Sequence, residues 1–219
     1  MKEFEDKRLP VRTKDGSLSL FSERYSQHYH SIHGARQESL HVFIANGLVM
    51  FEYLAEISIL EIGMGTGLNI LVTLESTSIQ KKVNYLSLEK YPLSEPEWTS
   101  ILPSFQTEQF QRIHRAKWNS TIELQKNFLF EKQQIDFLDY RSEPKHHLIY
   151  FDAFSPEAQP ELWSTLMFET LNKCMLPGGL LVTYCAKGEV RRNMLAAGFK
   201  VEKRPGPPGK REMLAAWKM

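Results

Sequence analysis

The chain has 219 residues, of which 42% are hydrophobic and 24% are charged, and its formal net charge is +1 at pH 7. These values are typical of one globular domain with a substantial core, and they argue against a generally basic nucleic-acid coat. The charge is uneven, because residues 187–219 carry nine Lys or Arg and three Glu, which leaves −5 for the remaining chain. A basic C-terminal face can bind a polyanion, although a solvated charged face explains the same pattern equally well.

The chain has few cysteines and no targeting signal. Cys174 and Cys185 are too isolated for a disulfide framework or a CxxC metal site, so we expect buried thiols in a reducing compartment. The first residues do not resemble a signal peptide, and no apolar stretch approaches membrane-spanning length. We therefore expect a cytoplasmic protein without a membrane partner.

The N-terminal segment combines turn, strand and aromatic signals. Residues 17–21 alternate after an Asp-Gly turn, which predicts a short strand or hairpin arm. Residues 25–35 contain three histidines and two tyrosines, but no Cys or Glu completes a zinc spacing. A polar, aromatic pocket wall for a planar ligand explains this segment better than a metal site. Gly34 then opens a helical pattern.

A glycine-rich loop separates a predicted strand from a predicted helix. Residues 57–62 form an apolar run, the loop Gly63-Met64-Gly65-Thr66-Gly67 follows, and residues 68–74 have a helical pattern. The sixth position of a dinucleotide fingerprint is Leu68 here, which disfavours NAD. The acidic Glu61 is costly beside a pyrophosphate but favourable beside the ammonium group of S-adenosylmethionine. The loop resembles the first motif of Rossmann-like methyltransferases, although a tight strand–helix turn without a ligand is the alternative.

Further carboxylates follow the next predicted strands. Glu89 ends a strand over 83–89, where a carboxylate can accept hydrogen bonds from both ribose hydroxyls. Residues 97–114 look partly helical, and 121–125 and 128–130 look like paired strands. The resemblance to methyltransferases implies that Asp136, with Phe137 beside it, recognises adenine. Asp139 is the rival for that contact, and a helix cap or a surface charge is the structural alternative.

The apolar run 148–151 ends in Asp152, and a Ser-Pro turn follows. In an open parallel sheet such a run is a buried central strand, and ligands bind outside the carboxyl ends of those strands. We expect Asp152 beside the glycine-loop strand and facing the reaction centre, with a helix cap as the alternative. Beyond it we predict one helix from Pro160 to the Pro-Gly-Gly at 177–179. A strand over 180–184, a helix ending before residue 198, and strands over 199–202 and 213–217 around a basic loop complete the pattern.

Several short motifs together resemble the MnmD/MnmC methyltransferase family, from about residue 10 to the C-terminus. They are Asp15-Gly16-Ser17, Tyr29-His30-Ser31 with Gly34-Ala35, Glu38-Ser39 with Val42-Phe43, Asp152-Ala153-Phe154-Ser155-Pro156, Pro160-x-Leu162-Trp163, Pro177-Gly178-Gly179, Thr183-Tyr184 with Arg191-Arg192, and Pro205-Gly206 with Gly209-Lys210-Arg211-Glu212-Met213. One departure is His146-His147, where family members more often carry an acidic residue; it lies away from the predicted site, and we expect little consequence.

The resemblance implies an α/β, Rossmann-like class I S-adenosylmethionine-dependent methyltransferase fold, with a mostly parallel seven-stranded sheet and helices on both faces. We expect a methyltransferase domain over 51–219 and an N-terminal extension over 1–50 packed on the site, in one structural unit. The implied reaction is N-methylation of the 5-aminomethyl group of the wobble uridine (position 34) in tRNA, which gives 5-methylaminomethyl-(2-thio)uridine. Some members carry a flavin oxidase domain behind the methyltransferase, and this chain resembles the stand-alone form.

The resemblance also implies site residues. Asp152 is the catalytic candidate, because a carboxylate can orient the attacking amine and take up its developing positive charge. The cofactor candidates are Glu61, Gly63, Gly65, Gly67, Glu89, Asp136, Phe137 and Asp152. The candidates for binding the tRNA anticodon stem-loop are Tyr29, His30, Phe154, Ser155, Pro156, Tyr184, Lys187, Arg191, Arg192, Lys210 and Arg211. No metal is expected. The rival functions are a small-molecule or protein N-methyltransferase and a non-catalytic nucleic-acid-binding module.

Overall fold

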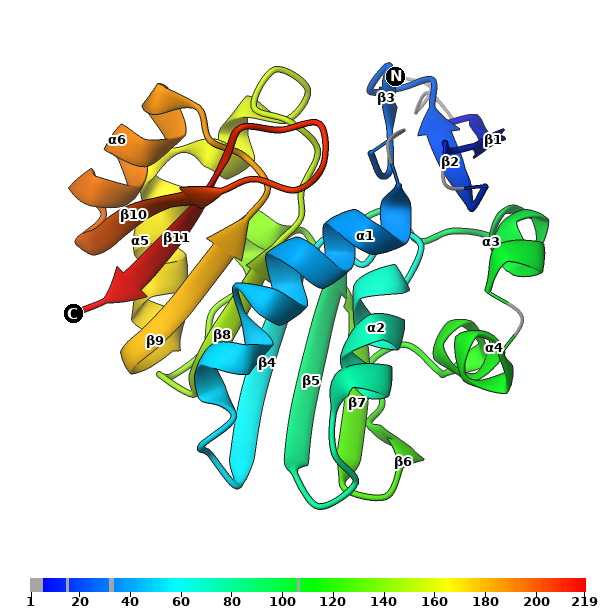
Figure 1. Ribbon diagram of the computed structural model, residues 1–219, viewed down its shortest axis with the longest axis horizontal. Coiled ribbons are helices and arrows are strands. Elements are labelled where there is room, and N and C mark those ends of the chain that lie inside the picture. Colours follow the sequence, from blue (N-terminus) through cyan, green and yellow to red (C-terminus); the bar gives the residue numbers. More distant parts are fainter. Residues whose placement is uncertain (1–5, 15, 32–33, 106) are drawn as a thin grey trace.

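A central sheet crosses the molecule, with helices on both of its faces (Figure 1). This computed structural model describes residues 6–14, 16–31, 34–105 and 107–219. The strands of the central sheet are β4 (Glu56–Ile62), β5 (Lys82–Glu89), β6 (Ile122–Gln125), β7 (Phe128–Gln134), β8 (His146–Phe151), β9 (Met175–Thr183), β10 (Phe199–Pro205) and β11 (Glu212–Lys218). Their spatial order is β10-β11-β9-β8-β4-β5-β7-β6.

The five inner strands are parallel, as the predicted fold class requires. The parallel pairs are β7–β5, β5–β4, β4–β8 and β8–β9, whereas β6, β11 and β10 pair antiparallel. The described sheet therefore has eight strands rather than the seven expected. The additional strand is β6, which forms the edge of the sheet and pairs with β7. The chain turns between these two strands at Lys126 and Asn127, and Asn127 adopts φ 67° there.

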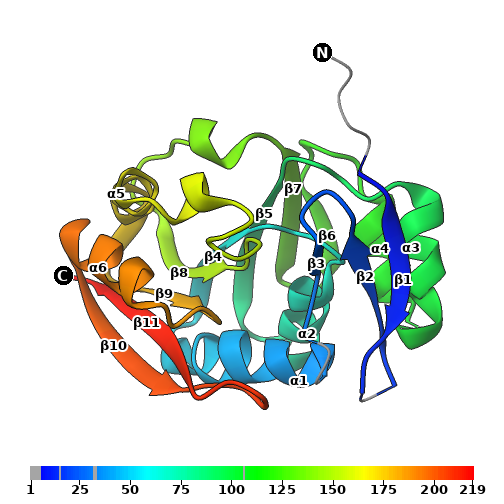
Figure 2. The same cartoon turned by 90° about the horizontal axis from the view of Figure 1, so that it is seen from above.

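The two faces of the sheet bury two separate apolar clusters, which follow the alternation along β4. Ile57 and Ile59 face a cluster shared with helices α1 to α4, while Leu60 and Ile62 face a cluster shared with α5 and α6. Figure 2 shows α1 and α2 on one side of the sheet and α5 on the other. The helices are α1 (Ala35–Ser39), α2 (Leu68–Ser76), α3 (Glu95–Ile101), α4 (Glu108–Arg115), α5 (Thr165–Cys174) and α6 (Gly188–Ala196).

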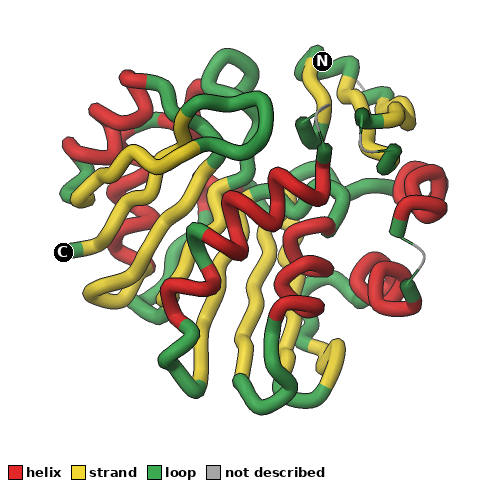
Figure 3. Tube along the Cα trace, viewed as in Figure 1, coloured by secondary structure: helices red, strands yellow, loops and turns green. Residues whose placement is uncertain are grey.

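Short helical segments fill several connections (Figure 3). Helix α1 continues as a π-helix over Leu40–Ala45, and 3-10 helices span Leu48–Phe51, Leu102–Ser104, Phe137–Asp139 and Pro160–Trp163. The single helix predicted from Pro160 is therefore two elements. Ser164 separates them, because its hydroxyl accepts a hydrogen bond from the Met167 N–H and caps α5. Helix α5 ends at Cys174, and the Pro-Gly-Gly lies inside β9 instead of ending the helix.

A second, three-stranded sheet lies over the carboxyl ends of the central strands. Its antiparallel strands are β1 (Arg8–Arg12), β2 (Leu18–Ser22) and β3 (Gln27–His28), in that order. Strand β2 confirms the predicted hairpin arm. None of the helices within the described ranges is both long and apolar enough to cross a membrane.

Candidate active site

The carboxyl ends of β4, β5 and β8 meet at one cavity of about 390 Å³. Strand β4 leads into the glycine loop, β5 ends at Glu89, and β8 leads into Asp152. Strand order reverses between β4 and β8, since β5 and β7 extend one way and β9 the other. The cavity therefore lies at a topological switch point, where doubly wound sheets bind ligands. Strands β1 to β3 and the loop 205–212 approach the same edge (Figure 1).

Gly63 sits where the backbones after β4 and β8 come closest together. It adopts φ 90°, and a Cβ atom at this position would lie 2.8 Å from the Asp152 carbonyl oxygen. Only glycine fits both this conformation and this approach. Gly63 and Gly65 line the cavity. Gly67 caps the start of α2 and does not line it.

Two carboxylates near the carboxyl ends of β5 and β7 have different surroundings. Glu89 lines the cavity and accepts hydrogen bonds from the backbone N–H groups of Gly65 (3.1 Å) and Tyr91 (2.8 Å). Burial raises the pKa of Glu89, and these backbone bonds oppose the rise. Asp136 caps the 3-10 helix that begins at the buried Phe137, and it pairs with Lys90 (2.5 Å).

Of these residues, Phe137 lines the cavity, whereas Asp136 does not. Burial acts against ionisation of Asp136, but its bonds to Lys90 and Leu138 hold its pKa below the usual value. The rival Asp139 is exposed and contributes nothing to the cavity wall.

Asp152 lines the cavity directly after β8. Its Oδ2 accepts a hydrogen bond from the Asn69 side-chain amide at 2.7 Å. Burial raises the pKa of Asp152 to about 7; the Asn69 bond opposes this rise, the charge of Glu38 adds to it and Lys210 counters it. Near neutral pH this carboxyl is therefore balanced between its ionised and protonated forms.

Lys210 brings the basic C-terminal loop to the cavity. Its ammonium lies 2.7 Å from Glu38 Oε1 and 4.0 Å from the centroid of the Tyr184 ring. The Tyr184 hydroxyl in turn donates to the Ala153 carbonyl at 2.9 Å. The carboxylate and the aromatic face hold this cation near Asp152, where its charge acts on the Asp152 carboxyl.

The N-terminal sheet forms an aromatic and polar wall opposite Asp152. Tyr25 and Tyr29 pack against Phe154, with ring centroids 4.6 Å and 5.0 Å apart. Gln27 donates to the Ser155 hydroxyl (2.5 Å) and accepts from the Ser155 backbone N–H (3.1 Å). The structure therefore places a polar, aromatic wall where the sequence predicted one. His33 lies outside the described residues, and the described part of the chain holds no metal-binding group of three or more His, Cys, Asp or Glu.

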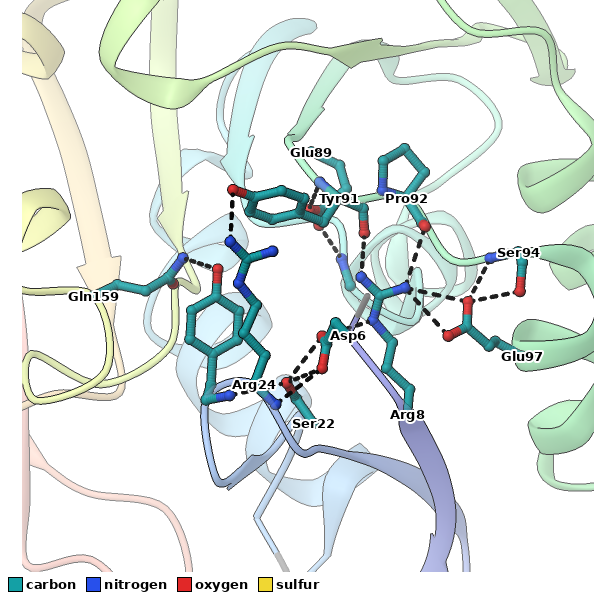
Figure 4. A network of polar contacts seen from close by, with 12 residues as sticks. Asp6, Arg8, Ser22, Arg24, Glu89, Tyr91, Pro92, Ser94, Glu97 and Gln159 are labelled. Carbon is teal, nitrogen blue, oxygen red and sulfur yellow. Dashed lines mark hydrogen bonds and ion pairs between the residues drawn. The ribbon is translucent and has the colours of Figure 1, made fainter. Parts of the chain in front are cut away.

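A polar network fastens this wall to the loop after β5 (Figure 4). Arg8 donates to both carboxylate oxygens of Glu97 (3.2 Å each) and to the Tyr91 carbonyl (2.9 Å). Arg24 lies 4.4 Å above the Tyr91 ring, and Gln159 donates to the Tyr25 hydroxyl at 3.3 Å. The N-terminal sheet thus contacts both the loop that follows Glu89 and the loop that follows Asp152.

The structure gathers some predicted site residues and leaves others outside. Those that line the cavity are Tyr29, His30, Gly63, Gly65, Glu89, Phe137, Asp152, Phe154, Ser155, Tyr184 and Lys210. Those that do not line it are Glu61, Gly67, Asp136, Pro156, Lys187, Arg191, Arg192 and Arg211. Glu61 is fully buried below the cavity, whereas Lys187 is exposed and paired with Glu157.

Sequence reasoning missed several residues that shape the site. Asn69 was treated as one position of a helix, although a polar amide among Leu68, Ile70 and Leu71 is a signal for a buried partner. Gln27 and Arg8 carry no comparable signal, because their partners lie 128 and 89 residues away in the chain. Only the folded arrangement shows what they contact.

Comparisons with known proteins identify the family to which this chain belongs. Residues 95–219 match the model of a family described as S-adenosyl-L-methionine-dependent methyltransferase. The chain belongs to this family, and its cofactor is S-adenosylmethionine. Along 94% of its length it is 30% identical to the tRNA 5-methylaminomethyl-2-thiouridine biosynthesis bifunctional protein MnmC of Cupriavidus metallidurans, and along 92% it is 30% identical to that of Leptospira interrogans. The aligned regions cover 33% and 34% of those proteins, so the chain spans about a third of the curated relatives it matches.

Solved structures are similar over the whole chain. The crystal structure of MNMC2 from Aquifex aeolicus has a TM-score of 0.76 and 26% sequence identity, and the match covers 97% of this chain and 70% of that one. A spermidine synthase in complex with the transition-state analogue AdoDATO has a TM-score of 0.63 at 10% identity, covering 100% and 71%, which shows a shared fold alone. These findings confirm the resemblance to MnmC proteins and the Rossmann-like methyltransferase fold.

The residues around the cavity fit this cofactor. Gly63 and Gly65 line the cavity without side chains, so a ligand can approach the backbone of the loop closely. The Glu89 carboxylate, which lines the cavity, offers acceptors suited to ribose hydroxyls, and Phe137 and Tyr91 offer apolar surface to a planar base.

Proposed function

We propose that this protein methylates the amine of the 5-aminomethyl group on the wobble uridine of tRNA, giving the 5-methylaminomethyl form. The observation that carries the proposal is Asp152, a carboxyl in a cavity with an aromatic wall. Burial raises the pKa of this carboxyl to about 7. The chain that carries this cavity is a methyltransferase, and it is similar to proteins named for 5-methylaminomethyl-2-thiouridine biosynthesis in tRNA. At about 30% identity, this similarity supports the tRNA substrate as a proposal.

Asp152 is proposed to hold and orient the attacking amine. S-adenosylmethionine supplies an electrophilic methyl group when it is bound. The amine attacks only when it is neutral, so an ammonium ion must first lose a proton, and an ionised Asp152 can accept a hydrogen bond or that proton. Asn69 fixes one oxygen of the carboxylate and leaves the other for the substrate. Positioning of this kind accounts for much of the rate enhancement in displacement reactions.

The cofactor is proposed to rest against residues from three strand ends. Gly63 and Gly65 would lie beside it, Glu89 would accept the ribose hydroxyls, and Phe137 would contact the adenine. Asp136 is proposed to approach the adenine amino group from beside Phe137. To do so it would have to turn from its pairing with Lys90, because its side chain does not line the cavity in this structure.

The substrate base is proposed to enter between the N-terminal wall and the basic loop. Tyr29, Phe154 and Tyr184 line this part of the cavity and provide aromatic faces on which a splayed base can stack. The cations outside the cavity then serve the tRNA backbone rather than the base. They are Lys187, Arg191, Arg192 and Arg211, and all belong to the C-terminal part of the chain.

The proposal is tested by giving the purified protein methyl-labelled S-adenosylmethionine and two classes of acceptor. One is tRNA from cells that make the aminomethyl group but cannot methylate it, and the other is a panel of small primary amines. We expect label in the tRNA, located at the wobble nucleoside after digestion. Label in small amines alone would replace this proposal with a small-molecule N-methyltransferase.

A further inference from the structure

A buried polar cluster lies beneath Asp152, between β4, β5 and α2. Glu61 is 0% exposed, and its Oε2 accepts a hydrogen bond from the Ser87 hydroxyl at 2.6 Å. Asn69 is 2% exposed, and its Nδ2 donates to Asp152 Oδ2 at 2.7 Å. The remaining oxygens of these two residues, Glu61 Oε1 and Asn69 Oδ1, are both buried without a hydrogen-bond partner among the described residues.

The surroundings of Glu61 disfavour a negative charge. Within the described ranges it forms no ion pair with a Lys, Arg or His. The titratable groups that act on it are Asp152, which follows β8, Tyr85 on β5 and Tyr150 on β8, and none of them is a cation. A buried carboxylate without a cation is costly, whereas the neutral acid is not.

The electrostatic balance agrees with this geometry. Burial raises the pKa of Glu61 to about 8; the charge of Asp152 adds to the rise, and hydrogen bonding by Ser87, Asn69 and Tyr85 opposes it. The Asn69 and Tyr85 side chains therefore both lie near the Glu61 carboxyl, and the Tyr85 hydroxyl is likewise buried without a hydrogen-bond partner among the described residues. A raised pKa favours the neutral acid, whose O–H can donate a hydrogen bond.

We propose that Glu61 is a positioning residue, held as the neutral acid, whose O–H donates to Asn69 Oδ1 and so directs the Asn69 Nδ2 toward Asp152. One proton then satisfies two buried oxygens that can otherwise only accept. It also selects one orientation of the Asn69 amide, since the flipped amide would present its oxygen to the Asp152 carboxylate. This inference rests on the proposed role of Asp152 in methyl transfer.

The proposed role differs from the one that the glycine-loop motif suggests for Glu61. An ionised Glu61 that attracts the ammonium group of the cofactor would have to face the cavity, but this side chain does not line it. The two roles predict opposite effects of a neutral substitution. Glu61→Gln keeps a donor for Asn69 and an acceptor for Ser87, but it removes the capacity for negative charge.

The first test compares Glu61→Gln, Glu61→Leu and the control Glu56→Gln, an exposed glutamate at the start of the same strand. Calorimetry gives the cofactor Kd, and steady-state methylation of tRNA gives kcat and KM. We expect Glu61→Gln and the control to stay within about threefold of the wild type in every constant. Glu61→Leu should lose about tenfold to a hundredfold in kcat at unchanged cofactor Kd, because Asp152 is misplaced. Weakening of the cofactor Kd by Glu61→Gln, or equal losses of kcat in Glu61→Gln and Glu61→Leu, would overturn the proposal.

The second test needs neither turnover nor a leucine variant that folds. Infrared spectra are taken between about pH 7 and about pH 8 on protein whose glutamate carboxyls carry carbon-13. The label shifts the band of a protonated glutamate such as Glu61 away from that of Asp152, which is not labelled. We expect a protonated-carboxyl band in the wild type that is missing in Glu61→Gln. No such band in the wild type, or a band that persists in Glu61→Gln, overturns the inference. If the wild type fails to methylate tRNA but shows this band, only the proposed function fails.

Discussion

The polar side chains at the two ends of β8 differ in how completely they are hydrogen-bonded. At the start of the strand, His146 is 1% exposed and both ring nitrogens have partners, the Tyr140 hydroxyl at 2.9 Å and the Ser58 hydroxyl at 3.2 Å. Burial lowers the pKa of His146 to about 3, which keeps the ring neutral. At the other end, Asn69 holds one oxygen of Asp152, and the side chain borders a cavity.

The difference separates a structural polar group from a group prepared for a ligand. Complete hydrogen bonding stabilises the fold at the amino end of the strand, where nothing needs to bind. Incomplete pairing and a carboxyl balanced near neutrality mark the carboxyl end as the place where a ligand supplies the missing contacts. Substitutions at the two ends should therefore affect different properties of the protein.

The largest effect is expected at Asp152. Asp152→Ala should lower kcat for tRNA methylation by about 10³-fold, because it removes the group proposed to orient the amine and accept its charge. The cofactor Kd, measured by calorimetry, should change little, since the glycine loop and Glu89 remain. Near-normal turnover by this variant would contradict the assignment.

A second large effect is expected at Gly63, where the ends of β4 and β8 meet. Gly63→Ala places a methyl group 2.8 Å from the Asp152 carbonyl at a φ of 90°, so it should cost about 1–3 kcal/mol of unfolding free energy and weaken cofactor binding. Gly178→Ala is the matched control, with a φ of 74° but no atom within 4 Å of the added carbon. Denaturant unfolding and cofactor titration compare the pair. Equal losses in both variants would show that strain alone, rather than the close approach, limits this position.

At the amino end of β8 the effect should fall on stability alone. Tyr140→Phe removes the partner of His146 Nε2 and should lower the free energy of unfolding by about 1–3 kcal/mol, because a buried polar atom is left unsatisfied. The kcat of the folded variant should equal that of the wild type. A selective loss of kcat at unchanged stability would show that the two strand ends do not differ as described.

The smallest effects are opposite displacements of the pH profile. If Asp152 acts as the carboxylate, kcat should rise as the pH increases through about 7. Glu38→Gln removes a charge that raises the pKa of Asp152, so the rise should move to lower pH. Lys210→Met removes a charge that lowers this pKa, so the rise should move to higher pH. Displacements in the same direction, or none, would show that Asp152 does not set the profile.

Local patterns predicted the strand ends more fully than the contacts between them. The run 57–62 with its glycines, Glu89 after 83–88 and Asp152 after 148–151 were all predicted, because strand periodicity and turn chemistry are local properties. The hydrogen bond from Asn69 to Asp152 joins residues 83 positions apart, and nothing in either local pattern specifies it. The burial of Glu61 below the cavity likewise depends on how α2 packs on β4.

The differences between the predicted and the observed elements have the same physical origin. The predicted pairing of residues 121–125 with residues 128–130 is confirmed as β6 and β7, and it adds an eighth strand at the edge of the sheet. The helix predicted from Pro160 divides at Ser164, where the side chain competes with the backbone for a hydrogen bond. Charge counting predicted a basic C-terminal face, yet only Lys210 among its cations lines the cavity.

The central claim is that the cavity beside Asp152 methylates an aminomethylated wobble base. The most direct measurement is mass spectrometry of the wobble nucleosides of undermethylated tRNA after incubation with S-adenosylmethionine and either the wild type or Asp152→Ala. The account predicts conversion of 5-aminomethyl to 5-methylaminomethyl nucleosides by the wild type and none by the variant. An unchanged wobble nucleoside with the wild type, or equal conversion by both proteins, would contradict it.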